Sequence, residues 1–347
     1  MTSPADRQAL FFTGPSTVEV RREACPAPAP GEVLVRTVVS AISAGTELLI
    51  FRGLAPARMA ADATLGSLPG SLAFPLKYGY ACVGRIVGLG PNVDARLGML
   101  VFAFQPHQTY FTAPLADLVP LPEGFPVERA ALLPSAETAI NFLHDGRPLT
   151  GEKVVVFGQG VVGLLTTALL SSMPLQALLT VDPDAHRRRT SLSLGASAAF
   201  DPLSSDGVAP VVATLAEPAP PGADLVYELS GDPAALDAAL RVAGFDGRVV
   251  IGSWYGEKRA TLDLGSEFHR SRIRLIASQV STLAPSLRGR WTHARRLAYA
   301  WTFLEKVAAE RLISHRVPFA EAGEAYLLLT DPRRPALQVV LTYPDED

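Results

Sequence analysis

The sequence predicts an α/β protein that combines a β-rich part with a doubly wound parallel sheet. Short β-branched and aromatic runs, separated by proline and glycine, fill the first third of the chain, as in strands joined by turns. Residues 153–163 then join a β-branched run to a G-x-G-x-x-G motif. From there to about residue 277 strand and helix patterns alternate, which indicates a parallel sheet covered by helices.

Composition sets the outer limits of the interpretation. The chain has 347 residues, of which 48% are hydrophobic and 19% charged, so two well-packed domains are expected. A net charge of −3 gives no electrostatic reason to expect nucleic acid or an anionic membrane as partner. The start of the chain has no signal-peptide pattern, and no apolar run is long enough to span a bilayer. Cys25 and Cys82 are too few for a disulfide framework. We therefore expect a cytoplasmic protein.

Residues 1 to about 136 are expected to form strands rather than helices. The candidates are residues 9–12, 17–20, 32–40, 81–89 and 99–104, each rich in β-branched or aromatic side chains. Between them, residues 53–77 contain three prolines and several glycines. A loop of this length in a compact domain is usually a lid, a pocket wall or a disordered excursion.

The G-x-G-x-x-G motif gives each glycine a separate task in a dinucleotide-binding turn. Gly158 allows the tight turn, Gly160 lets the backbone approach a pyrophosphate, and Gly163 lets helix and strand pack closely. The pyrophosphate would lie on the amides at the N-terminus of the following helix. A second apolar run, 175–181, ends at Asp182, about 20 residues beyond the glycines, where an acid accepts hydrogen bonds from a ribose.

The remaining elements follow from periodicity. Helices are predicted at 126–144, 161–170, 185–194, 291–308 and 319–329, and strands near 154, 178, 198–200, 225–228, 249–251, 273–277 and 337–341. The run 273–277 would be an outer strand of the parallel sheet. An uncovered edge of this kind favours pairing with a second chain, so we expect a homodimer.

Nearly the whole chain resembles the medium-chain dehydrogenase/reductase superfamily. The resemblance is carried by the glycine motif and by residues 30–35, 45–47, 79–87, 121–124, 194–196 and 312–319. It implies a GroES-like catalytic domain at 1–136 and 283–347, and a Rossmann NAD-binding domain at 137–282. In the superfamily the active site lies in the cleft between two such domains.

The positions that would hold catalytic zinc depart from the superfamily pattern. Alcohol dehydrogenases of this superfamily use cysteine, histidine and a further cysteine or glutamate, where by the resemblance this sequence has Ala44, Tyr80 and Pro134. None of these binds zinc as a thiolate, imidazole or carboxylate does. The resemblance is closest to a zinc-lacking group around the dehydrogenase of hydroxyethyl bacteriochlorophyllide. We therefore expect no metal, and hydrogen-bond donors in its place.

Four residues are candidates for catalysis, each with a structural alternative. By the resemblance Thr46 occupies the hydroxyl relay position, although a turn-stabilising role is open to it. Glu47 is either a general base or a buried structural acid. Tyr80 either points its phenol at the substrate oxygen or fills the space of the metal. His107 either exchanges protons near neutral pH or is a satisfied core histidine.

The cofactor positions also follow from the resemblance. Thr138 and Val162 match positions that pack on the nicotinamide ring, and the backbone of Gly252 and Ser253 matches the strand end that meets its carboxamide. Three consecutive arginines at 187–189 suggest a phosphate, but Asp182 would repel a 2′-phosphate. We therefore expect NAD rather than NADP.

Taken together, these features predict a zinc-independent NAD(H)-dependent oxidoreductase that interconverts a secondary alcohol and a ketone. Reduction of an activated C=C bond and dinucleotide binding without turnover are the two alternatives. The apolar loop 53–77 favours a bulky, largely apolar substrate, and arginines 288, 290, 295 and 296 around Trp291 could hold an acidic group on it. Glu137 and Asn141 lie on one face of their predicted helix. Two roles are open to them, polar lining of a pocket or a structural role in capping or packing.

Overall fold

The structure is a computed structural model and describes residues 4–344. The chain forms two compact units, Met1–Pro134 with Leu304–Asp347, and Ser135–Phe303. The first boundary lies within two residues of the expected one. The second lies after residue 303 rather than 282, so the segment 283–303 belongs to the Rossmann unit.

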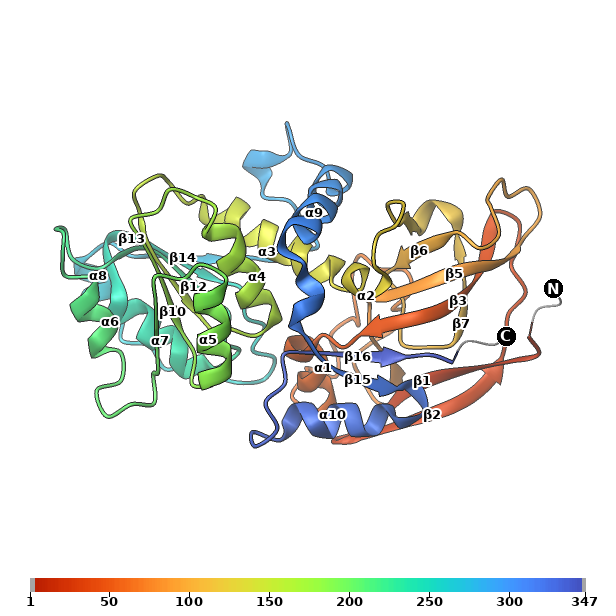
Figure 1. Cartoon of the computed structure of the whole chain (residues 1–347). Coiled ribbons are helices and arrows are strands. Elements are labelled where there is room, and N and C mark those ends of the chain that lie inside the picture. The colour runs from red at the N-terminus through yellow and green to blue at the C-terminus, as the bar shows by residue number, and fades with distance from the viewer. Residues whose placement is uncertain (1–3, 345–347) are drawn as a thin grey trace. The chain divides into compact units, whose positions relative to one another are not determined.

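The first unit is built from two sheets, and both ends of the chain contribute to the larger one (Figure 1). Its strand order is β15-β16-β3-β5-β6-β8, with β7 paired to β3. The strands are β3 (Glu32–Ala41), β5 (Cys82–Leu89), β6 (Leu100–Ala103), β7 (Tyr110–Pro114), β8 (Val119–Pro120), β15 (Ile313–Pro318) and β16 (Gln338–Thr342). The smaller sheet has the order β2-β1-β4, from β1 (Asp6–Gly14), β2 (Thr17–Ala24) and β4 (Leu76–Lys77).

Three α-helices belong mainly to this unit: α1 (Ala44–Phe51), α2 (Val127–Ala130) and α10 (Ala322–Thr330). Helix α10 lies against α1 and β2, so the C-terminal segment packs on residues from the start of the chain. The unit's core includes Val33 and Val35 of β3, Ile86 of β5 and Phe111 of β7, all at most 1% exposed. Alternation along these strands places the apolar side chains on one face.

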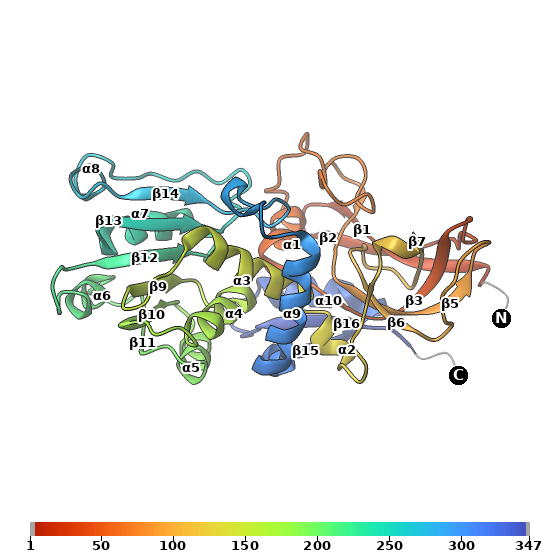
Figure 2. The same cartoon turned by 90° about the horizontal axis from the view of Figure 1, so that it is seen from above.

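The second unit is a six-stranded parallel sheet with the order β11-β10-β9-β12-β13-β14. Its strands are β9 (Lys153–Phe157), β10 (Ala177–Val181), β11 (Ala198–Phe200), β12 (Ala223–Glu228), β13 (Ala243–Ile251) and β14 (Arg274–Ala277). In Figure 2 the six strands follow one another in this order. With β9 as the first strand, the order is 3-2-1-4-5-6, which is the doubly wound arrangement of dinucleotide-binding domains.

Helices cover both faces of this sheet. The helices of this unit are α3 (Leu133–Gly146), α4 (Val161–Leu170), α5 (Ala185–Ser193), α6 (Ala209–Thr214), α7 (Pro233–Val242), α8 (Glu267–Arg270) and the part of α9 (His293–Val307) up to residue 303. Val154 and Val156 of β9 pack with Phe142 of α3, whereas Val155 and Phe157 belong to a cluster that includes α7. Every residue of β9 is buried, which explains its continuous apolar run.

The predicted helix 126–144 is interrupted. Helix α2 ends at Ala130, and α3 begins at Leu133 and extends to Gly146. Pro134 has no N–H to donate and is tolerated in the first turn of a helix, so a new helix begins there. The prediction also missed α1, whose eight residues carry glycine and threonine and show little amphipathic pattern.

The segment 53–77 is ordered, so a disordered excursion was the wrong alternative. Leu68 and Leu72 are buried, and the backbone of Leu72 bonds to that of Met59. Asp62 accepts two backbone hydrogen bonds, from Thr64 and Leu65. Much of the apolar composition of this segment is therefore used in packing within the first unit.

Within residues 4–344, no helix has the length and apolar character needed to cross a lipid bilayer. The expected helix 291–308 is α9, which begins two residues later at His293. Trp291 therefore precedes the helix instead of lying on it.

Candidate active site

Glu47 is the centre of a buried hydrogen-bond network in the first unit. It lies in the first turn of α1, and its side chain is fully buried. The carboxyl group accepts from the backbone N–H of Ser43 at 2.7 Å, from the Tyr326 hydroxyl at 2.5 Å and from Nε2 of His107 at 3.0 Å. The contact with the backbone N–H of Ser43, the N-cap residue, ties the Glu47 carboxyl group to the start of the helix.

His107 extends this network to two further hydroxyls. Its Nδ1 lies 2.7 Å from Ser40 Oγ, which in turn lies 2.8 Å from the Tyr343 hydroxyl. A carboxylate only accepts hydrogen bonds, so the imidazole carries a proton on Nε2, and a neutral ring accepts at Nδ1 from Ser40. Of the two roles expected for His107, the geometry matches a core histidine with both nitrogens paired.

Ser40, Tyr326 and Tyr343 were not identified from the sequence. The ring of Tyr326 is fixed between Phe12 and Phe51, at centroid distances of 5.2 and 5.3 Å. Burial, together with the charge of Glu47, raises the pKa of Tyr326 well above its usual value, so this hydroxyl remains a donor. The two tyrosines come from the C-terminal segment, and no local pattern links them to α1.

A glycine allows the turn that brings Tyr80 beside this network. Gly79 has φ of +117°, in the region that favours glycine. A Cβ at this position would lie 2.7 Å from the His107 ring. The neighbouring Tyr78 packs edge-on against Tyr80, with centroids 6.1 Å apart. The motif Tyr-Gly-Tyr is therefore explained by close packing on the imidazole.

Tyr80, Ser43 and Thr46 form a chain of hydroxyl groups at the half-buried start of α1. Ser43 Oγ forms a hydrogen bond with the Tyr80 hydroxyl. The Tyr80 hydroxyl in turn donates to Thr46 Oγ1 at 3.4 Å. Burial raises the pKa of Tyr80, partly offset by its hydrogen bonds with Ser43 and Thr46. At neutral pH the phenol is therefore protonated. A chain that runs from Ser43 through Tyr80 to Thr46 leaves the Thr46 hydroxyl as a donor for another acceptor.

The donor set of this region does not fit a zinc ion. Tyr80 is engaged with two hydroxyls, and Ala44 and Pro134 offer no side-chain ligand. Over the described range 4–344, no group of three or more histidine, cysteine, aspartate or glutamate side chains is arranged to hold a metal. Hydroxyl groups, the Glu47 carboxyl group and the His107 imidazole occupy this part of the unit, and both His107 nitrogens are committed to hydrogen bonds with Glu47 and Ser40.

The glycine motif has the geometry required of a dinucleotide site. A Cβ on Gly163 would lie 1.9 Å from the Gly158 carbonyl oxygen, so close contact between helix α4 and the turn requires glycine. A Cβ on Gly160 would meet nothing within 4 Å. The space over Gly160, at the N-cap of α4, is therefore open for a ligand, and the helix N-terminus favours an anionic one.

Asp182 is bound to the same turn. Its carboxylate accepts from the backbone N–H of Gln159 at 2.7 Å and from that of Asp184 at 2.8 Å. Burial raises the pKa of Asp182, opposed by these backbone donors. Each carboxylate oxygen has two lone pairs, so acceptor capacity remains for a ribose. Arg188, in the predicted arginine run, bonds to the Asp182 and Pro183 carbonyls.

The other predicted cofactor positions lie on the same unit. Val162 packs in the core cluster that contains Phe142, and Phe142 is four residues beyond Thr138 on α3. A Cβ on Gly252 would lie 2.4 Å from the Phe142 ring, so this glycine allows strand and helix to approach. The Ser253 hydroxyl accepts from the backbone N–H of Gly231 at 2.8 Å.

Sequence reasoning missed Glu228, at the carboxyl end of β12. It is fully buried, and its carboxylate accepts from the Ser230 backbone N–H at 2.8 Å and from the hydroxyls of Ser230 and Tyr255. A Cβ on Gly158 would lie 2.5 Å from the Ser230 Cα. Glu228 thus holds the segment that packs against the glycine motif, although nothing in the sequence around it distinguishes it from other strand-end acids.

Glu137 and Asn141 are used in packing rather than in lining a pocket. Arg296, 1% exposed, donates to Glu137 Oε1 at 2.9 Å and to Asn141 Oδ1 at 2.6 Å. Burial raises the pKa of Glu137 despite this partner. The expectation that Arg296 holds a substrate carboxylate is therefore wrong. These contacts also explain why the start of α9 belongs to the Rossmann unit.

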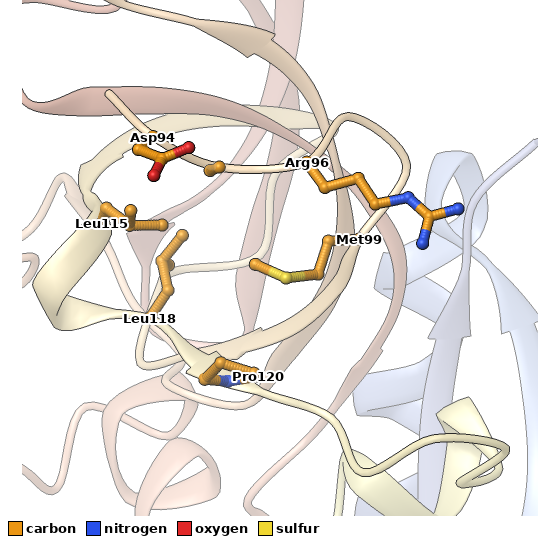
Figure 3. A pocket seen from close by; sticks show the side chains of 7 residues that line it. Asp94, Arg96, Met99, Leu115, Leu118 and Pro120 are labelled. Carbon is orange, nitrogen blue, oxygen red and sulfur yellow. The ribbon is translucent and has the colours of Figure 1, made fainter. Parts of the chain in front are cut away.

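The first unit also contains an open hollow of about 430 Å³ that is separate from the hydroxyl chain. Met99, Leu115, Leu118 and Pro120 line it, and the Arg96 side chain extends away from its centre (Figure 3). None of the predicted catalytic residues lines this hollow.

Comparison with known proteins agrees with these features. A family model described as zinc-binding dehydrogenase matches residues 161–298. The chain is 27% identical to D-guloside 3-dehydrogenase of Escherichia coli, over 86% of this chain and 89% of that protein. It is 26% identical to 2-desacetyl-2-hydroxyethyl bacteriochlorophyllide A dehydrogenase of Cereibacter sphaeroides, over 92% of each. These similarities support the resemblance to the medium-chain dehydrogenase/reductase superfamily.

The fold is shared over nearly the full length with solved structures. The structure of 2R,3R-butanediol dehydrogenase from Bacillus subtilis aligns with a TM-score of 0.78 and 19% identity, over 98% of this chain and 100% of that chain. Solved structures of this fold hold NADH in one case and NADP in another. The fold alone therefore does not decide between the two cofactors. The matched range 161–298 contains none of the three zinc positions, so the name of the family model does not bear on them.

Proposed function

We propose that this protein is a zinc-independent NAD(H)-dependent oxidoreductase that interconverts a secondary alcohol and a ketone. The observation that carries the proposal is the hydroxyl chain of Ser43, Tyr80 and Thr46. By the resemblance, Tyr80 in this chain stands at a position where metal-dependent alcohol dehydrogenases place a zinc ligand. Relatives named as a guloside dehydrogenase and a butanediol dehydrogenase support the reaction class. The guloside and the bacteriochlorophyllide named for two relatives support a bulky molecule.

The hydroxyl chain supplies what a ketone needs from the protein. A carbonyl oxygen gains negative charge when hydride reaches its carbon, and a positioned donor stabilises that charge. Thr46 donates to the oxygen, and Tyr80 donates to Thr46 while accepting from Ser43. In ketone reduction a proton passes from Thr46 to the oxygen, Tyr80 restores the proton of Thr46, and Ser43 restores that of Tyr80. Ser43 is part-exposed and regains its proton from water. In alcohol oxidation the proton moves the other way along the same chain.

Glu47 and His107 position this chain instead of reacting. Both are fully buried, and their polar atoms are committed to each other and to Ser43, Ser40 and Tyr326. The Ser43 backbone bond to Glu47 fixes the start of α1, from which both Ser43 and Thr46 project. The negative charge of Glu47 also contributes to the raised pKa of Tyr80, which keeps that phenol protonated.

The residues of the glycine motif fit a nicotinamide dinucleotide, whose C4 atom supplies or accepts the hydride when it is bound. Gly160 and the amides at the start of α4 would hold the pyrophosphate. Asp182 would accept hydrogen bonds from the adenosine ribose and disfavour a 2′-phosphate, which supports NAD. Both cysteines are free thiols, which suits the reducing cytoplasm that we propose for this protein.

The test combines metal analysis with a hydroxyl variant. Purified protein should contain no stoichiometric zinc and should reduce a bulky aryl or alicyclic ketone with NADH in the presence of chelator. Thr46→Val should lower kcat by roughly 100-fold, the effect of losing one oxyanion donor. Thr46→Ser retains the hydroxyl and should retain most of the activity.

Two outcomes would overturn the proposal. One tightly bound zinc per chain, with activity lost on chelation, would contradict a metal-free mechanism. Product analysis that shows a saturated ketone from an enone, with the carbonyl intact, would assign the protein to alkene reduction.

A further inference from the structure

A pocket of about 270 Å³ lies within the Rossmann unit, between the end of α3 and the segment before α9. Leu143, Leu287 and Trp291 give it apolar walls, and Arg147 and Arg290 give it two guanidinium groups. None of the candidate catalytic or cofactor residues lines it. The pocket therefore requires an explanation of its own.

Neither arginine of the pocket has an acid partner. Arg147 donates to the Ser286 hydroxyl, and the ion pairs found among residues 4–344 include neither Arg147 nor Arg290. Arg296, by contrast, is paired with Glu137. Arg288 and Arg295 donate to the backbone carbonyls of Leu283 and Arg290 and do not line the pocket. Two positive charges thus face one small pocket without an internal counter-charge.

The apolar wall is held in a fixed position. The Arg295 guanidinium lies 4.3 Å from the centroid of the Trp291 ring, and the His144 ring lies 4.2 Å from it at an interplanar angle of 55°. Arg295 also donates to the Arg290 carbonyl. Trp291 is therefore braced by two side chains, and the segment that carries Arg290 is tied to α9. A braced wall lowers the ordering cost of binding a ligand.

We propose that this pocket binds a small organic carboxylate. Guanidinium groups bind planar carboxylates through paired, charge-assisted hydrogen bonds, and the leucines and Trp291 accommodate an apolar body. The volume is near the lower end of the range for small-molecule pockets, roughly 300–1,000 Å³, which limits the ligand to a short chain or a single ring. This site goes beyond the proposed hydride transfer, and its test does not depend on that activity.

His144 provides a local reporter of binding. Its Nδ1 is buried and has no hydrogen-bond partner. Burial and the charges of Arg296, Arg295 and Arg290 lower the pKa of His144 to about 4. A carboxylate bound at Arg290 would offset part of that positive field, so occupancy should raise the pKa of His144.

The binding experiment uses the full-length protein and sodium hexanoate as the probe. Calorimetry should show saturable binding, and the His144 ring signals should shift in NMR as hexanoate is added. Arg147→Gln and Arg290→Gln should each weaken binding by roughly tenfold, and the double variant should abolish it. The control Arg270→Gln removes an exposed arginine of α8 and should leave binding unchanged.

The proposal would be overturned by no saturable binding of hexanoate, by undiminished binding to the double variant, or by equal binding of the neutral analogue hexanamide. Equal affinity for inorganic phosphate would also refute an organic carboxylate, because phosphate makes no use of the apolar wall.

A kinetic experiment distinguishes two sources of such a carboxylate, the substrate itself and a separate ligand. If it is part of the substrate, Arg290→Gln should raise KM for 5-oxohexanoate but not for its methyl ester. If it is a separate ligand, hexanoate should bind while the KM values of acid and ester change together. Should neither ketone be reduced, the hexanoate titration still decides the site by itself.

Discussion

At the scale of single residues, Glu47 shows how one acid can be fully committed to structure. All three of its neighbours in the network donate to it. In Glu47→Gln, an amide N–H₂ replaces an acceptor and leaves at least one buried donor without a partner. The free energy of unfolding should fall by about 3 kcal/mol, within the range for a buried donor left unpaired beside a charged group.

Urea denaturation of Glu47→Gln checks this value, with Tyr326→Phe as the matched variant. Tyr326→Phe removes one donor but keeps the ring between Phe12 and Phe51, so its loss should be smaller, about 1 kcal/mol. If Glu47→Gln were as stable as the natural protein, the assignment of three donors to the carboxylate would be wrong.

His144 makes a prediction about pH. Its pKa is lowered to about 4 in the folded protein from 6.5, first by burial and then by nearby arginines. The unfolded chain therefore binds the proton more readily, so the stability that His144 contributes is complete above pH 6.5 and is lost as the pH falls toward 4. His144→Gln should flatten the stability profile in this window, measured by urea denaturation at several pH values. The exposed His269 provides the control His269→Gln, which should leave the profile unchanged.

At the scale of elements, the turn between β9 and α4 separates two roles of glycine. Gly163→Ala places a Cβ 1.9 Å from the Gly158 carbonyl oxygen, whereas Gly160→Ala meets nothing within 4 Å. Gly163→Ala should therefore lower the free energy of unfolding of this unit by about 2–3 kcal/mol, as overpacking of a core does. Gly160→Ala should fold normally but bind NADH more weakly, because its methyl group occupies the ligand's side of the turn.

Thermal unfolding and NADH titration of both variants test this separation. A Gly160→Ala protein with unchanged NADH affinity would show that the pyrophosphate does not approach this residue.

Elements defined by local signals could be predicted, and contacts between remote segments could not. The glycine motif, β9 and α4 form one continuous stretch in which spacing carries the information. In contrast, Tyr326 and Tyr343 reach Glu47 and Ser40 only because β16 pairs with β3 and α10 packs on α1. Helix periodicity identified the helix that carries Tyr326 but not which partner its hydroxyl meets.

The arginines near Trp291 illustrate the same limit. Their spacing suggested a common role, but Arg296 is buried against Glu137, and Arg290 is the one of the four that lines the pocket beside Trp291. Its companion there, Arg147, follows the end of α3 and was not grouped with it in the sequence. Tertiary packing, which the order of charges along the chain does not specify, decides which charge is free to bind.

At the scale of the whole molecule, cofactor choice depends on Asp182. Asp182→Ala removes a carboxylate and its charge from the ribose side of the turn, so NAD binding should weaken by roughly 1–3 kcal/mol. Discrimination against NADP should fall at the same time, because no negative charge would remain to repel the 2′-phosphate. Calorimetry with both cofactors measures this. A natural protein that already prefers NADP would contradict the assignment.

Assembly is the last property that the fold allows us to predict. Strand β14 pairs with β13 on one side only and forms an outer edge of the six-stranded sheet. Its exposed edge carries unpaired backbone groups, which another copy of the strand can satisfy by extending the sheet across a twofold axis. We therefore propose a homodimer, with a mass by light scattering of twice the 36.9 kDa chain at micromolar concentration. The amides of residues 274–277 should exchange slowly in the dimer. A mass of one chain, or rapid exchange along β14 in a dimer, would show that this edge is not the interface.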